Sequence, residues 1–168
     1  MAKPLLELAR SIANTGAHDV AVDWLRNVPG LPPIVQTVHL LSIAVMLGSV
    51  VLMSLRTLGW IATSQDPREM AGRLAPWTWS ALPLLFLSGG IFVLARPQRY
   101  FTNPVFGLKV AFLLPALALA ALLYGKLKQD AATGASIRVL AGLNLLAWTA
   151  VILAGRWIAY ADYLFPPE

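Results

Sequence analysis

The sequence predicts an all-α integral membrane protein: an antiparallel bundle of four transmembrane helices, preceded by amphipathic helices at the membrane interface. Four apolar runs of 22 residues occupy most of the 168-residue chain. A bilayer core about 30 Å thick needs roughly 20 helical residues. Charged residues make up 12% of the chain, whereas a soluble domain has about 25%. Mean hydropathy is +0.67. Helices are predicted because every backbone polar group must be paired inside lipid.

The first 33 residues are too charged to cross the membrane, and they predict short helices lying at its surface. Apolar residues recur there at helical spacing, and Trp24 is placed to anchor the segment at the headgroups. Five charges make insertion costly: Glu7, Arg10, Asp19, Asp23 and Arg26. Glu7 and Arg10 also interrupt the position where a cleaved signal peptide would have its apolar core, so no such signal is predicted.

A proline- and glycine-rich stretch at residues 27–33 breaks the chain before the first span. The predicted spans are residues 34–55, 74–95, 104–125 and 139–160. They form a single transmembrane domain at 34–161, followed by a tail at 162–168. The connections are too short to hold a soluble domain. Four spans place both ends of the chain on one side of the membrane.

The positive-inside rule gives a predicted orientation. The connections between spans one and two and between spans three and four carry six basic residues: Arg56, Arg68, Arg73, Lys126, Lys128 and Arg138. The opposite side carries nearly as many, but fewer of them adjoin a span. The prediction is therefore a multi-pass protein of a bacterial inner membrane, with these two loops cytoplasmic and both termini periplasmic.

Composition excludes several functions. The net charge of +5 belongs to a membrane protein, in which Lys and Arg collect near headgroups, so no nucleic-acid partner is predicted. Without cysteine there is no disulfide, thiolate ligand or thioether-attached haem. The spans contain no pair of carboxylates, no His-x-x-x-His pair and no Ser-His-Asp arrangement. No catalytic residue is predicted.

Polar residues inside the spans are the candidate functional residues, because they are costly in hydrocarbon. His39 lies in the first span and is the candidate metal ligand, since neutral imidazole binds haem iron, copper or zinc. The alternative is a hydrogen bond to a neighbouring helix.

Lys109 and Arg156 are the other candidates for cofactor binding. Neither has a carboxylate partner in the spans, so each must reach the interface or meet an anion from elsewhere. The beginnings of spans one and three and the end of span four lie at one depth. His39, Lys109 and Arg156 could therefore surround one site. A haem propionate, a quinone oxygen or a lipid phosphate would complete it.

Several short motifs resemble a family of uncharacterised bacterial four-span membrane proteins, the DUF6644-like family. They are residues 38–41, Gly48, residues 55–59, Tyr100, and residues 103–109, 141–144 and 155–160. The resemblance covers roughly residues 20–160 and implies the fold but no activity. His39 and Lys109 are also similar, more weakly, to features of haem-associated CopD-like and HemJ-type families. Those families often have further histidines in other spans, and this chain has only His18, which precedes the spans.

Two functions remain open. The sequence favours a non-catalytic accessory or assembly subunit of a larger membrane complex, because the chain is small and its loops are minimal. Its partners would be the lipid bilayer and either other membrane subunits or further copies of itself. The alternative is a membrane electron-transfer protein that binds b-type haem or a quinone through His39, with Lys109 and Arg156 as anion partners. Haem b is thus the candidate cofactor under this alternative, but the sequence alone does not establish that a cofactor binds.

Overall fold

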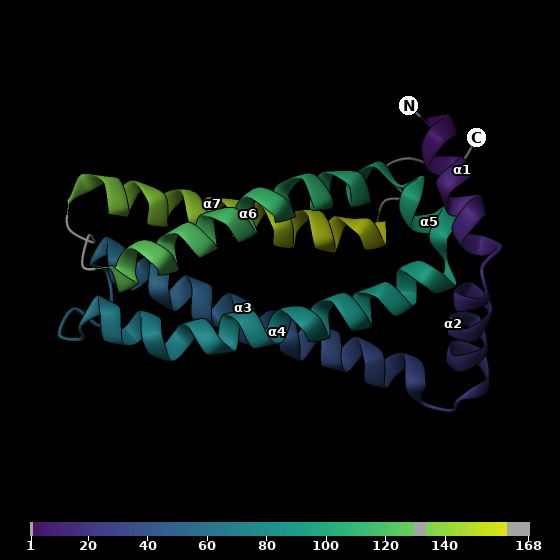
Figure 1. Ribbon diagram of the computed structural model, residues 1–168, viewed down its shortest axis with the longest axis horizontal. Helices are drawn as coiled ribbons and strands as arrows, with labels where there is room; N and C mark the ends of the chain where they lie inside the picture. Colours follow the sequence, from purple (N-terminus) through teal and green to yellow (C-terminus); the bar gives the residue numbers. More distant parts are fainter. Residues whose placement is uncertain (1, 130–133, 161–168) are drawn as a thin grey trace.

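The computed structural model describes residues 2–129 and 134–160. Four long helices are packed antiparallel: α3 (Leu31–Leu58), α4 (Pro67–Ala95), α6 (Pro104–Lys128) and α7 (Ala135–Trp157) (Figure 1). Each is long and apolar enough to cross a bilayer. The predicted fold class is confirmed, and the chain is a four-span membrane protein. The tail predicted at 162–168 lies outside the described residues.

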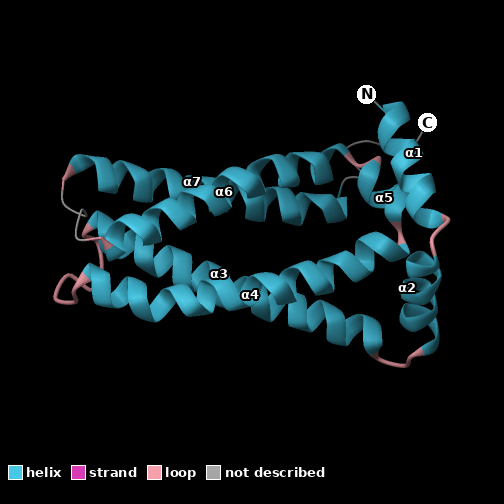
Figure 2. Ribbon diagram, in the orientation of Figure 1, coloured by secondary structure: helices cyan, strands magenta, loops and turns pink. Residues whose placement is uncertain are grey.

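The long helices form two hairpins, α3–α4 and α6–α7. Packing is most extensive within each hairpin, while α3 against α7 and α4 against α6 join the two hairpins together. The end of the bundle that carries the α3–α4 and α6–α7 connections is called the loop end below. The opposite end is called the cap end, because three short helices lie across it (Figure 2).

Three of the long helices, α3, α4 and α7, begin earlier than the predicted apolar runs, because proline and polar residues suit a first helical turn, whereas α6 begins where its run was predicted. Before α3, Gly30 adopts a left-handed conformation with φ of 78°, and prolines occupy the first turn. The Asp66 side chain caps α4, and Asn103 caps α6 through the Val105 N–H. The last helix also ends before its predicted run does: α7 ends at Trp157, and a 3-10 turn, η1 (Ile158–Tyr160), follows it.

Three short helices make up the cap: α1 (Ala2–Ala13), α2 (Gly16–Asn27) and α5 (Pro97–Phe101). α1 packs against α5, and α2 packs against α4. Thr15 caps α2, and the imidazole Nδ1 of His18 lies 2.8 Å from the Leu94 carbonyl oxygen. Trp24 is half-exposed on α2, as an interfacial anchor requires. His18 is therefore used to fix the cap onto α4.

The apolar core occupies the loop end and the middle of the bundle. One cluster, near the loop end, joins all four long helices through residues such as Met53, Ala75, Leu123 and Ala141. A second cluster in the middle contains Met46, Val50, Ala81, Ala116, Trp148 and Val151. Neither cluster extends to the first turns of α3, and toward the cap end α3 runs away from α6 and α7 (Figure 1).

Two buried side-chain hydrogen bonds join the hairpins near the loop end. The hydroxyls of Thr78 on α4 and Tyr124 on α6 are 2.9 Å apart. Asn144 Nδ2 on α7 donates to Ser54 Oγ on α3 at 2.9 Å. The Asn144 Oδ1 and the Trp148 Nε1 are buried without a partner among the described residues. Polar groups thus hold the two hairpins together where the apolar core is densest.

Candidate functional site

His39 lies on α3 near the cap end and is packed against α4. Its Nδ1 is 2.8 Å from Ser88 Oγ. The ring also lies directly over the backbone of Gly89, where an added Cβ would stand 3.2 Å from the ring carbon Cε1. That distance is shorter than an ordinary van der Waals contact. The absence of a side chain at Gly89 therefore leaves room for the half-buried imidazole.

The partners of Ser88 determine which ring nitrogen carries the proton. The Ser88 hydroxyl donates to the Leu84 carbonyl, so its oxygen is left to accept from His39. We therefore assign the proton to Nδ1. No hydrogen bond is recorded for Nε2 within the described part of the chain, and its lone pair is left to bind a metal or accept a proton.

Lys109 reaches from α6 onto α7. Its side chain crosses Gly155, with Cε 3.7 Å and Nζ 3.9 Å from where a Cβ on that glycine would stand. Lys109 is half-buried near the beginning of α6, so it lies at the same end of the bundle as His39 but on the other hairpin. No ion pair is recorded for this ammonium within the described residues. The structure therefore places His39 and Lys109 at the same end of the bundle, one on each hairpin.

Arg156 follows Gly155 on α7 but is turned elsewhere. Its Nη2 donates to the Tyr160 hydroxyl at 3.1 Å, and its guanidinium lies over the Tyr160 ring at 5.2 Å. The side chain is exposed. Its recorded contacts are with Tyr160, so a shared site with His39 and Lys109 would require Arg156 to leave that ring.

Three residues of this arrangement were not predicted as site residues. They are Ser88 and Gly89 on α4 and Gly155 on α7. The sequence contains a general signal for each contact, although it does not identify the partner. A serine next to a pair of glycines on one span can hold a histidine from another span. A glycine near the end of a span leaves room for a lysine at the same depth.

Metal binding by protein ligands alone is not supported. The described residues contain no group of three or more His, Asp or Glu side chains that could hold an ion. Met46, seven residues after His39, is buried in the middle cluster. The arrangement suits a metal that brings most of its own ligands, as haem iron does when it takes one axial histidine.

Comparisons with known proteins agree with the fold and leave the activity open. The model of one family matches residues 31–161, and that family is described as one of unknown function. No curated protein and no solved structure shows a detectable match to this chain.

Proposed function

We propose that this chain, which belongs to the DUF6644 family of unknown function, binds a bilayer-soluble cofactor through His39 at the cap end. The cofactor class is b-type haem or a quinone, and the role of such a group is electron transfer within the membrane. The observation that carries the proposal is the hydrogen bond from His39 Nδ1 to Ser88, which leaves Nε2 free.

Each cofactor class makes a different use of Nε2. With haem, His39 would hold the group through Nε2, and the Nδ1–H bond to Ser88 would orient the imidazole ring. With a quinol, Nε2 would accept a hydrogen bond from a ring hydroxyl. In either case the Lys109 ammonium supplies the positive partner, to a propionate or to a quinone oxygen. Arg156, exposed beside the same end, is proposed as a further anion partner near the headgroups.

An absorption spectrum of protein purified in mild detergent tests the haem class, and extraction followed by chromatography tests the quinone class. We expect His39→Ala to abolish the Soret band or the extractable quinone. His18→Ala is the matched control, because His18 is engaged with Leu94 and should leave the cofactor in place. Arg156→Ala should weaken retention without removing the axial ligand. Wild-type protein that carries neither chromophore nor quinone, and binds neither on addition, would refute the proposal.

A second role, as an accessory or assembly subunit, has its own support on α6. Gly107, Ala111, Pro115 and Ala118 are exposed and follow one another at helical spacing on the outer face of that helix. Small residues on a lipid-facing stripe are typical of helix association in membranes. Cysteines introduced at positions 111 and 118 should cross-link to a partner subunit or to a second copy. Absence of any cross-link in native membranes would count against this role.

The proposed location is a bacterial inner membrane with the loop end cytoplasmic and both termini periplasmic. Its support is the group of basic residues at the loop end, among them Arg56, Lys126 and Arg138. A reporter fused after residue 168 should be active only if it functions in the periplasm.

A further inference from the structure

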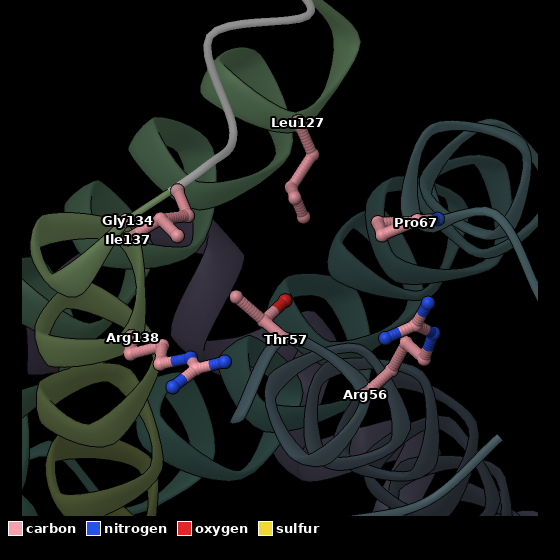
Figure 3. Close-up of a pocket in the computed structure, with 7 residues that line it drawn as sticks. All are labelled: Arg56, Thr57, Pro67, Leu127, Gly134, Ile137 and Arg138. Atoms are coloured by element: carbon pink, nitrogen blue, oxygen red, sulfur yellow. The ribbon is translucent and has the colours of Figure 1, made fainter. Parts of the chain in front are cut away.

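A second candidate site lies at the loop end, far along the bundle from His39. It is a hollow of about 260 Å³ between the two hairpins. All four long helices contribute to its lining, together with Gly134, the residue that precedes α7. The lining residues are Arg56, Thr57, Pro67, Leu127, Gly134, Ile137 and Arg138 (Figure 3). Pockets for drug-sized ligands measure roughly 300–1,000 Å³. This one has the size for a smaller group.

The polar part of the lining is positive. Arg138 points toward Thr57, and Arg56 lies on the other side of that residue (Figure 3). Arg56 donates from Nε and Nη2 to the backbone carbonyl of Gln65, and from Nη2 to that of Thr63. No hydrogen bond or ion pair is recorded for Arg138 within residues 2–129 and 134–160. None of the seven lining residues is a carboxylate.

The first turn of α7 adds a third positive element. Gly134 precedes this 23-residue helix and provides no side-chain cap. The first N–H groups of a helix have no partner within it, and they carry the positive end of the helix dipole. Two guanidinium groups and an uncapped helix start thus face one hollow.

We propose that this hollow binds a phosphate group, with Arg138 as its main contact and Arg56 and the start of α7 as further donors. Arginine forms paired hydrogen bonds with phosphate oxygens. The group would come from an anionic phospholipid headgroup or from free phosphate. Its place between transmembrane helices at the predicted cytoplasmic side is where basic pockets bind lipid headgroups. Leu127, Ile137 and Pro67 provide apolar wall for the adjoining lipid.

Native mass spectrometry of the full chain in neutral detergent tests this directly. The probes are phosphatidylglycerol, phosphatidylcholine and inorganic phosphate, each added separately. We expect wild-type protein to retain phosphatidylglycerol in preference to phosphatidylcholine. Arg138→Gln should weaken that retention roughly tenfold, since it removes charge-assisted hydrogen bonds. Lys126→Gln is the matched control. It removes one charge from the same end outside the hollow and should leave retention unchanged.

The three probes distinguish a lipid headgroup from free phosphate, and the two variants distinguish a specific site from general attraction to a positive surface. Retention of inorganic phosphate but not of phosphatidylglycerol would support the phosphate site and assign it to the free ion. Equal retention of both phospholipids by wild-type protein, with no binding of inorganic phosphate, would overturn the proposal without reference to any variant. Equal weakening by Arg138→Gln and Lys126→Gln would also overturn it, because it would show general attraction to a positive surface.

Discussion

The two ends of the bundle are built differently. At the loop end, polar side chains bond from one hairpin to the other, through Thr78 with Tyr124 and Asn144 with Ser54. At the cap end, no side-chain hydrogen bond recorded among the described residues runs from one hairpin to the other. His39 bonds to Ser88 inside α3–α4, Lys109 crosses Gly155 inside α6–α7, and His18 joins α2 to α4.

This contrast suggests different tasks for the two ends: the loop end stabilises the fold, and the cap end is where we propose that a cofactor binds. In lipid, helices gain no hydrophobic driving force from meeting each other, so packing and hydrogen bonds decide which surfaces stay together. The loop end has both. The cap end instead has a half-buried histidine and a half-buried lysine on different hairpins, and these two residues are the basis of the ligand site proposed there.

The largest effect is expected from removing packed atoms at the loop end. Leu123 is 0% exposed in the cluster there, whereas Leu87 is 67% exposed. Leu123→Ala should cost about 2 kcal/mol, the lower part of the range for buried leucine. The unfolded helices also remain in lipid, so lost packing dominates that cost. Leu87→Ala should change stability by less than about 0.5 kcal/mol. Unfolding by increasing sodium dodecyl sulfate measures both, and equal costs would remove the distinction between the ends.

The next effect concerns the seat of His39. Gly89→Ala would place a methyl group 3.2 Å from Cε1 of the ring, so we expect displacement of the imidazole and a cost of about 1 kcal/mol. Gly90→Ala is the matched control, because nothing lies within 4 Å of its added Cβ. Alanine favours helix over glycine, so Gly90→Ala should be neutral or stabilising. A histidine ring resonance that moves in the control as much as in Gly89→Ala would show that close approach at Gly89 does not position the ring.

Sequence was sufficient for the fold because span length is a physical requirement of the bilayer. Each predicted run lies within or close to an observed helix, and the errors fall at helix ends, where Pro32 and Pro67 begin turns that hydropathy does not register.

The candidate site could be predicted only in part from the sequence. Helix direction predicted that His39 and Lys109 lie at one depth, and both are found near the cap end, on different hairpins. Rotation about a helix axis is invisible in an almost uniformly apolar span, so neither the pairing of His39 with Ser88 nor the turning of Arg156 toward Tyr160 could be predicted. The loop-end hollow depends on residues from four helices and was likewise out of reach.

A smaller effect sharpens the comparison at the loop end. A double-mutant cycle with Thr78→Val and Tyr124→Phe should give a coupling of about 0.6 kcal/mol, the average for hydrogen bonds between membrane helices. The same cycle with His39→Ala and Ser88→Ala joins helices of one hairpin. Its coupling should persist when the hairpins are produced as two separate chains, while the Thr78–Tyr124 coupling should depend on their association. The opposite pattern would mean that the cap end holds the hairpins together.

The smallest effect is expected at Arg156. Its contacts with Tyr160 are exposed, so their contribution to stability should lie at the low end of the range for exposed cation–π pairs, about 0.5 kcal/mol. Tyr160→Leu should therefore lower stability by no more than about 0.5 kcal/mol, because η1 lies outside both core clusters. It should also free Arg156 to meet an anion, so retention of an anionic cofactor should rise in Tyr160→Leu and fall in Arg156→Gln. Retention that is unchanged in both variants would assign Arg156 to the membrane interface alone and leave His39 and Lys109 as the binding residues of the cap end.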